Sequence, residues 1–308
     1  MNCARISAWW NLNKFSVLLV VLGSMLWGTD SLFRRPLSSE LSPITIVLLE
    51  HCILSAVLLP FLLQGKREML RLSARDWLSL AVIAVGGSVA ATSLFTYSIK
   101  YGNPSVTVLL QKTQPIFTTL LARIILRERP GTWFWRCLIP AIAGAYVLSA
   151  QDWRAGFQIA PQQYLSVLSA VTAAALWGSC TVFGRYVVLK LRVPVLTGLR
   201  FAIALPVLAF LFRLQAHDQR AMPTTFHSAL LVTGMALIPG LAALLFYYHG
   251  LRSTIASVAS VAELAFPVTA VVTNWLLLGI HLTQSQFWGG LLLVSSVTAL
   301  TYLDGRAK

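Results

Sequence analysis

Residues 25–35 read MLWGTDSLFRR, and residues 175–185 read ALWGSCTVFGR. Eight residues of the first half recur 150 to 152 positions later. In the first half they are Leu26, Trp27, Gly28, Phe33, Arg35, Phe95, Tyr97 and Pro115. Their counterparts, in the same order, are Leu176, Trp177, Gly178, Phe183, Arg185, Phe246, Tyr248 and Pro267. An internal repeat of this length indicates a fold built from two copies of one structural unit. We therefore expect two units, residues 1–152 and 153–308.

The composition indicates that each unit lies in a membrane. The chain has 308 residues, of which 57% are hydrophobic and 11% are charged, against about 25% charged residues in a typical soluble domain. Ten apolar runs, each close to the ~20 residues needed to cross a bilayer, lie at 15–33, 41–63, 77–99, 104–126, 133–150, 163–188, 194–213, 227–249, 253–279 and 284–303. We predict an all-α integral membrane protein with ten transmembrane helices.

The two units are predicted to have opposite orientations in the membrane. Each unit holds five spans, and an odd number of crossings makes the second unit enter from the other side. Inverted repeats of this kind are typical of carriers that work by alternating access, with the substrate site near the midplane between the halves.

The basic residues predict which side is cytoplasmic. With a cytoplasmic N-terminus, six of the 24 Lys and Arg residues fall outside, namely Arg34, Arg35, Lys100, Arg154, Arg213 and Arg220. Lys112 and Arg200 fall within spans, and the other 16 are on the inner side. This bias favours cytoplasmic termini and a bacterial-type inner membrane. The net charge of +14 is therefore read as a membrane signal and not as a nucleic-acid surface.

Four ionisable residues lie well inside the spans: Glu50, Lys112, Arg200 and Glu263. Such residues usually face the bundle interior and mark functional sites. Glu50 corresponds to Arg200 in the repeat, and Lys112 corresponds to Glu263 within one residue. Their depths predict two ion pairs, Glu50–Lys112 and Arg200–Glu263. The pairs either clasp each half structurally or face a central cavity, where they bind a zwitterion or carry a proton.

Other residues are weaker candidates for the same cavity. Trp27 and Trp177 serve either as cavity walls or as packing residues, and Gln111 and Gln114 flank Lys112 on one helix. Pro115 and Pro267 remove a backbone donor and are expected to kink their spans. Tyr97 and Tyr248 are read either as gate hydroxyls or as anchors at the membrane interface. Asp30 is placed to pair with Arg34 one helical turn later.

The paired LWG…F…R openings resemble the EamA family of the drug/metabolite transporter superfamily. Similar features are Pro194 with Leu199-Arg200, AELAFPV at 262–268, Thr283 with Gln286 and Gly289, and Glu128 after the fourth span. The resemblance covers nearly the whole chain. It implies ten helices, cytoplasmic termini, a monomer and export of small metabolites, often amino acids. Three positions depart from the pattern: Glu50 with His51, Ile280 and Lys112.

We predict a secondary transporter that moves a small polar or zwitterionic metabolite, such as an amino acid. No phosphate-binding loop, HExxH motif or nucleophile elbow is present in the sequence, so neither nucleotide-driven transport nor catalysis is expected. No cofactor or metal site is expected. A metabolite channel, an intramembrane enzyme and a non-transporting membrane partner remain as alternatives.

Overall fold

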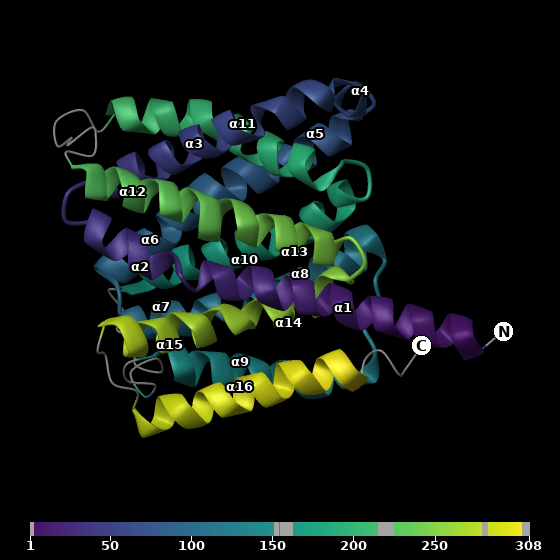
Figure 1. Cartoon of the computed structure of the whole chain (residues 1–308). Helices are drawn as coiled ribbons and strands as arrows, with labels where there is room; N and C mark the ends of the chain where they lie inside the picture. The colour runs from purple at the N-terminus through teal and green to yellow at the C-terminus, as the bar shows by residue number, and fades with distance from the viewer. Residues whose placement is uncertain (1–2, 151–153, 155–162, 215–224, 279–282, 304–308) are drawn as a thin grey trace.

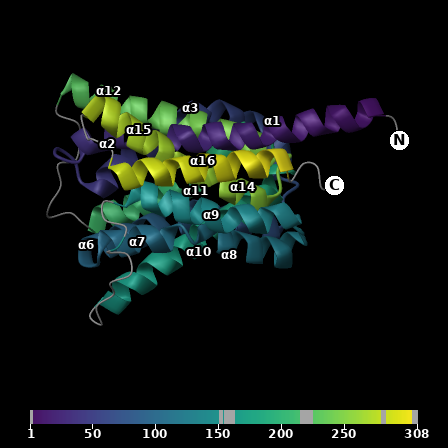
Figure 2. The same ribbon diagram turned by 90° about the horizontal axis from the view of Figure 1, so that it is seen from below.

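The computed structural model describes residues 3–150, 154, 163–214, 225–278 and 283–303. Within these residues the regular structure is helical, and the helices lie roughly parallel in one bundle (Figures 1 and 2). Eight helical stretches are long and apolar enough to cross a membrane: Phe15–Leu37, Pro43–Gln64, Ala74–Ile99, Tyr164–Val188, Val193–Leu214, Phe226–Leu251, Ala256–Leu277 and Gln284–Leu303. The expected spans 104–126 and 133–150 are helical but do not belong to this set. The expected boundary between the units, at 152–153, lies outside the described residues.

The first half of the chain contains helices that match the first five expected spans. They are α1 (Cys3–Trp27) with α2 (Asp30–Leu37), α3 (Pro43–Gln64), α5 (Ala74–Ala81) with the π-helical η1 (Val82–Ala91) and α6 (Thr92–Tyr101), α7 (Pro104–Gln111) with α8 (Gln114–Leu121) and η2 (Ala122–Leu126), and α9 (Thr132–Ser149). The short helix α4 (Lys66–Met69) connects α3 to α5.

The second half follows the same order. Its helices are α10 (Tyr164–Val188), α11 (Val193–Leu214), α12 (Phe226–Met235) with the π-helical η5 (Ala236–Ala242) and α13 (Ala243–Leu251), α14 (Ala256–Ala262) with the 3₁₀ turn η6 (Glu263–Ala265) and α15 (Phe266–Leu278), and α16 (Gln284–Leu303). The third span of each half therefore has a π-helical middle, and the fourth span of each half is interrupted.

Local sequence explains where several helices begin. The Ser42 side chain accepts a hydrogen bond from the Thr45 amide at 3.2 Å, and Pro43 occupies the first position of α3, where its missing N–H costs nothing. Thr225 caps α12 in the same way. Thr283 and Gln286 exchange side-chain to backbone hydrogen bonds of 3.1 and 3.2 Å at the start of α16, a capping box. The family-like Thr…Gln spacing thus forms a helix start.

Helices from opposite halves pack on each other. In the first half α1 lies on α13 and α15, and in the second half α10 lies on η1 and α8. Helix α3 packs on α11, and α9 packs on α16. Each of these contacts maps onto another one, or onto itself, when the two halves are exchanged. The functional interior therefore lies between the halves.

Gly28 and Gly178, the glycines of the repeated LWG motif, explain two of these close contacts. A Cβ at Gly28 would lie 2.4 Å from the Phe266 carbonyl oxygen, and a Cβ at Gly178 would lie 3.1 Å from the Gln114 carbonyl oxygen. Each glycine therefore lets its helix approach the interrupted fourth span of the other half.

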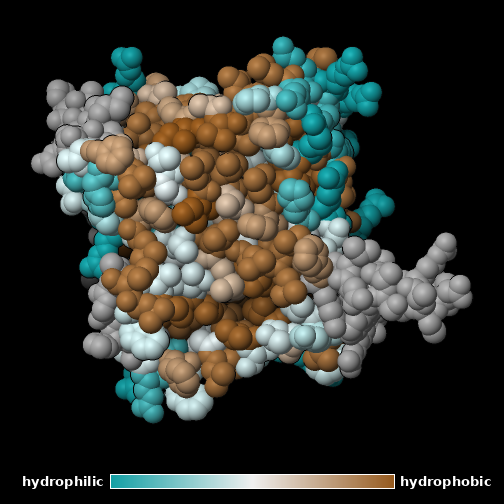
Figure 3. Space-filling model, in the orientation of Figure 1, coloured by the Kyte–Doolittle hydropathy of each residue, from teal (hydrophilic) through white to brown (hydrophobic). Residues whose placement is uncertain are grey.

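The molecular surface has an apolar belt between two polar ends. Figure 3 shows hydrophobic side chains over the middle of the bundle and hydrophilic ones mainly at its ends. Many large apolar side chains of the bundle are exposed, among them Leu78, Ile139 and Phe210. Exposed apolar surface of this extent is expected for helices in contact with lipid. The start of α1 and the end of α16 lie at the same end of the bundle (Figure 1).

Candidate functional site

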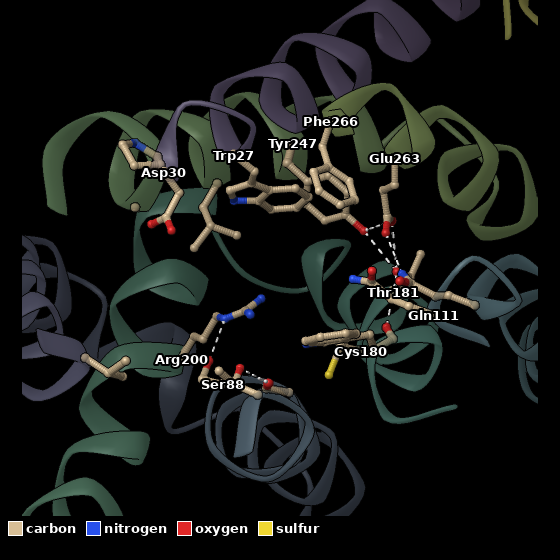
Figure 4. Close-up of a pocket in the computed structure, with 18 of the residues that line it drawn as sticks. Trp27, Asp30, Ser88, Gln111, Cys180, Thr181, Arg200, Tyr247, Glu263 and Phe266 are labelled. Atoms are coloured by element: carbon tan, nitrogen blue, oxygen red, sulfur yellow. Dashed lines mark hydrogen bonds between the residues drawn. The ribbon is translucent and has the colours of Figure 1, made fainter. Parts of the chain in front are cut away.

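A cavity of about 390 Å³ lies between the two halves of the bundle (Figure 4). This volume is in the range of pockets that hold small organic ligands. Six acidic or basic side chains, in addition to His51, line the cavity: Asp30, Arg34, Glu50, Lys112, Arg200 and Glu263. Three are acidic and three are basic, and both halves contribute to them.

The structure brings eight of the expected site residues to this one cavity. They are Glu50, Lys112, Arg200, Glu263, Trp27, Trp177, Gln111 and Gln114. The other four, Tyr97, Tyr248, Pro115 and Pro267, are not among the cavity-lining residues. The contacts of the charged groups differ from the two ion pairs that the sequence predicts.

The predicted Glu50–Lys112 pair is wrong, because Glu50 pairs with Arg34. Arg34 Nη2 lies 3.6 Å from Glu50 Oε2, and the Glu50 side chain is 12% exposed. Arg34 also binds Asp30 through two hydrogen bonds of 2.5 and 2.8 Å, so the expected Asp30–Arg34 contact is confirmed. The chain turns at Gly28 and Thr29 between α1 and α2, which brings the guanidinium to the cavity. The sequence alone predicts that Arg34 lies in an outer loop.

The predicted Arg200–Glu263 pair is also wrong. Arg200 donates to Ser88 Oγ at 3.3 Å and to the Tyr248 hydroxyl at 3.2 Å, which are uncharged partners. In Figure 4, Arg200 and Ser88 lie on the wall opposite Glu263. Depth along the membrane had predicted the pair, but the two side chains reach the cavity from different walls.

Glu263 is held by three uncharged donors. Gln114 Nε2 donates to Oε2 at 2.7 Å, while the Tyr247 and Thr181 hydroxyls donate to Oε1 at 2.7 and 2.9 Å. Gln114 belongs to the first half of the chain, and the other two donors belong to the second half. The carboxylate therefore connects the two halves inside the cavity.

Lys112 follows α7 at the break in the fourth span. Its side chain is 2% exposed, and its ammonium nitrogen lies 4.2 Å from the centre of the Phe266 ring. Within the described residues, no carboxylate lies within ion-pair distance of this nitrogen, and none of their atoms accepts a hydrogen bond from it. A cation–π contact stabilises a buried ammonium only in part.

The fourth span of each half, which contains Pro115 or Pro267, is interrupted beside its intramembrane charge. Helix α7 ends at Gln111 and α8 starts at Gln114, with Pro115 as its second residue. In the second half, η6 begins at Glu263 and α15 starts at Phe266, with Pro267 as its second residue. Proline lacks an N–H and is tolerated in the first turn of a helix. Lys112 and Glu263 thus lie at matching breaks.

Aromatic rings form one wall of the cavity. Figure 4 shows Trp27, Tyr247 and Phe266 side by side, facing Arg200 across the open space. The Trp27 and Tyr247 rings are 5.0 Å apart between centroids. Trp177 also lines the cavity and packs 5.3 Å from Phe95.

The two tyrosine candidates lie elsewhere. Tyr248 is 1% exposed and bonded to Arg200, so its reading as an anchor at the membrane interface is wrong. Tyr97 packs against Tyr101, with 4.7 Å between ring centroids.

Sequence reasoning did not select Arg34, Thr181, Tyr247, Ser88 and Cys180, which also line the cavity. Thr181 lies one helical turn after Trp177, and Tyr247 lies beside the matched Tyr248. Helical spacing from the repeated residues is thus a signal that finds Thr181.

Ion pairs tie the halves together at the end of the bundle where α4 and α5 begin (Figure 1). Asp76 Oδ1 lies 2.5 Å from Lys190 Nζ, and Glu68 pairs with Arg192. Glu128 accepts hydrogen bonds from the backbone amides of Ala256 and Ser257, at the start of α14. In each case the acid comes from the first half and its partner from the second.

The described residues contain no cluster of His, Cys, Asp and Glu side chains suited to a metal ion.

The model of the EamA-like transporter family matches residues 14–150 and again residues 164–302. The chain belongs to the EamA-like transporter family. The resemblance read from the LWG motifs is thereby confirmed, and each half of the chain carries one copy of the family unit.

This EamA-like transporter is similar to named membrane transporters over almost its whole length. It is 28% identical over 295 residues to the riboflavin transporter ImpX of Fusobacterium nucleatum, covering 93% of this chain and 97% of that protein. It is 23% identical to the uncharacterized inner membrane transporter YicL of Salmonella typhimurium, over 95% and 96% of the two chains. These names indicate a multi-pass membrane transporter and not an enzyme.

A crystal structure supports the fold of this EamA-like transporter. The two structures superpose with a TM-score of 0.78 at 19% identity, over 94% of this chain and 98% of the other.

Proposed function

We propose that this protein is a secondary carrier that moves a small, net-neutral polar metabolite through the central cavity by alternating access. The observation that carries the proposal is the central cavity with three acidic and three basic side chains, drawn from both halves. Charged groups within spans are costly, so they are typical of a transport pathway.

Alternating access is supported by the matched packing of the two halves. Helices α1 and α10 occupy equivalent places, as do the breaks at Lys112 and Glu263. We propose ten crossings, with α7–α8 and α9 as the fourth and fifth, and hence two inverted five-helix units at 1–152 and 153–308. Rocking of one unit against the other would expose the cavity to each side in turn.

The ties at one end of the bundle fit this mechanism. Asp76–Lys190 and Glu68–Arg192 hold the halves together at the end where α1 starts. The excess of basic residues supports placing this end, with both termini, in the cytoplasm of a bacterial cell with the protein in its inner membrane. Opening the cavity to the cytoplasm then requires these ion pairs to separate.

The charge balance of the cavity bears on the substrate. Three acids and three bases sum to no net charge, so a neutral or zwitterionic substrate adds no uncompensated charge. Amino acids meet this condition, and so does riboflavin, the substrate named for the 28% identical relative. Export is the direction that the family resemblance implies.

The decisive experiment is counterflow in proteoliposomes with purified protein. Riboflavin and a panel of amino acids are each loaded inside, and uptake of the labelled compound is measured with and without a pH gradient. A carrier gives saturable uptake that is accelerated by unlabelled substrate on the other side. Flux that neither saturates nor shows counterflow would establish a channel and refute the carrier mechanism.

Cys180 supplies a second test, because it lines the cavity and is 8% exposed. In a protein whose other cysteines (Cys3, Cys52 and Cys137) are replaced by alanine, we expect impermeant maleimide to label Cys180 from either side of the membrane, and substrate to protect it.

We propose that the protein is a monomer. Light scattering of the purified protein in detergent measures its oligomeric state.

A further inference from the structure

We propose that the cavity recognises a flat heteroaromatic ring that carries a carbonyl and N–H edge. The ring would stack on the aromatic wall, and Gln111 and Lys112 would read its edge. This inference rests on the proposed transport function and names the substrate class of the same cavity.

The aromatic wall provides a stacking surface. Trp27, Tyr247 and Phe266 come from α1, α13 and α15 and lie side by side toward the cavity (Figure 4). Trp27 and Phe266 are partly exposed, although the helices around them are tightly packed. Such surfaces bind planar π systems, whereas an aliphatic amino acid would cover little of them.

The ammonium of Lys112 requires an acceptor. It is buried, it lies over the Phe266 ring, and within the described residues it has no hydrogen-bond acceptor and no carboxylate partner. A buried donor without a partner is costly, so the cavity favours an occupant with a carbonyl or anionic oxygen at this point. Because the nitrogen lies over the face of the Phe266 ring at 4.2 Å, a flat ring stacked on the neighbouring Trp27 would place an oxygen at its rim next to this nitrogen.

The amide of Gln111 adds a second hydrogen-bonding group beside Lys112. Gln111 lines the cavity, and its side chain has no hydrogen-bond partner among the residues that the structure describes. Its neighbour Gln114 differs, because its amide is occupied by Glu263 at 2.7 Å. A free amide offers a donor and an acceptor together, which match a ring edge with a C=O next to an N–H.

The lysine and the glutamine therefore make a recognition pair with one geometry. Lys112 donates to one carbonyl oxygen, and Gln111 exchanges hydrogen bonds with the adjacent N–H and C=O. Simple amino acids lack this edge, and flat hydrocarbons lack the polar groups. The isoalloxazine ring of riboflavin has both the flat face and the carbonyl and N–H edge, which makes riboflavin a suitable probe.

Direct binding to purified protein tests the proposal, with riboflavin, N3-methylriboflavin and leucine as probes. N3-methylation removes the N–H of the edge and leaves the ring flat. We expect riboflavin to bind more tightly than its N3-methyl derivative by roughly 10-fold, the effect of one or two lost hydrogen bonds. We expect no measurable competition from leucine.

Variants separate the two parts of the site. Gln111→Leu should abolish the preference for riboflavin over N3-methylriboflavin, which loss of folding alone would not do selectively. Trp27→Leu should weaken both flavins by about 5- to 100-fold, as for loss of a stacking ring. Trp135→Leu, at a 53% exposed position on α9, is the matched control and should leave binding unchanged.

The outcomes distinguish this inference from the transport proposal. Counterflow of an amino acid without binding of either flavin would overturn the substrate class and leave the carrier intact. Equal binding of the two flavins by the unmodified protein would overturn the edge recognition. Flavin binding with the expected preference, but no counterflow, would support the site and refute the carrier.

Discussion

Arg34 Nη2 lies 3.6 Å from Glu50 Oε2, so the guanidinium of α2 compensates the carboxylate in the middle of α3. Arg34 holds Asp30 at the same time, which makes a cluster of one base and two acids at one end of the cavity. The cluster joins α2, the second part of the broken first span, to the second span, α3.

Replacing Arg34 should therefore destabilise the protein more than replacing Glu50. Loss of one partner of a fully buried pair costs about 3–5 kcal/mol, and we expect about 2 kcal/mol for Arg34→Gln because Arg34 is 36% exposed. Glu50→Gln should cost less, since Arg34 keeps Asp30. Thermal unfolding of the detergent-purified variants measures this order. The double variant with both Arg34→Gln and Glu50→Gln is the further comparison. If the two single variants lose equal stability and the double variant loses the full sum of both, the contact between the two side chains contributes nothing.

The three donors around Glu263 should each stabilise the folded state. Gln114→Leu and Tyr247→Phe each remove one hydrogen bond to a buried carboxylate, and we expect a loss of about 1–3 kcal/mol in the free energy of unfolding. Tyr247→Phe retains the ring against Trp27. Tyr164→Phe, at a 69% exposed position, serves as the control and should change nothing. Unfolding monitored by tryptophan fluorescence gives the comparison, and an unaltered Gln114→Leu protein would contradict the hydrogen-bond assignment.

Gly28 should not tolerate even a methyl group. An added Cβ would lie 2.4 Å from the Phe266 carbonyl oxygen, a backbone atom that cannot rotate away. Overpacking of this kind costs about 1–3 kcal/mol. Gly86→Ala is the matched control, because its Cβ would meet nothing nearer than 3.6 Å. Both variants are compared by yield and melting temperature, and a Gly28→Ala protein as stable as Gly86→Ala would argue against the close approach of α1 and α15.

The Asp76–Lys190 ion pair predicts that the stability of the protein depends on pH in the alkaline range. The hydrogen bond to Asp76 raises the pKa of Lys190 above its usual 10.5, with a smaller contribution from Tyr186. The ion pair contributes its full stabilisation below the pKa that Lys190 has in the unfolded chain. This stabilisation is lost as the pH rises through the higher pKa that Lys190 has in the folded protein. Wild-type protein should melt above Lys190→Gln at neutral pH, and the difference should vanish at strongly alkaline pH. Lys66→Gln, at an exposed lysine of the same end, is the control. A difference that persists unchanged with rising pH would exclude the charged tie as its cause.

Much of the fold follows from the sequence for physical reasons. Apolar length and the LWG repeat identify the spans, and family resemblance follows from Trp27, Gly28 and their matched partners. Eight predicted spans reappear as long apolar helices. The span at 133–150 appears as a helix of 18 residues, and the span at 104–126 is divided by the break at Lys112. Each of these spans contains a basic residue, Arg136 in 133–150 and Lys112 in 104–126, which makes it less apolar.

The partners inside the site could not be read from the sequence. Depth in the membrane predicted Glu50 with Lys112, but depth does not fix the rotation of a helix about its axis. Because the chain turns after Gly28, Arg34 lines the cavity and does not lie in the loop that the sequence predicts. Tyr247 illustrates the same point, because its neighbour Tyr248 carried the repeat signal while Tyr247 contacts Glu263. Residue identity thus predicted a polar interior, and three-dimensional packing decided its contacts.

The breaks at Lys112 and Glu263 occupy matching places, yet they carry opposite charges. A symmetric dimer of two first halves would bring two ammonium groups to one cavity, and a dimer of two second halves would bring two carboxylates. Either assembly would leave like charges facing each other in the membrane interior. Only the joined, unequal halves place an ammonium at one break and a carboxylate at the other, so the two breaks differ chemically and the chain can hold an asymmetric cargo in a single orientation.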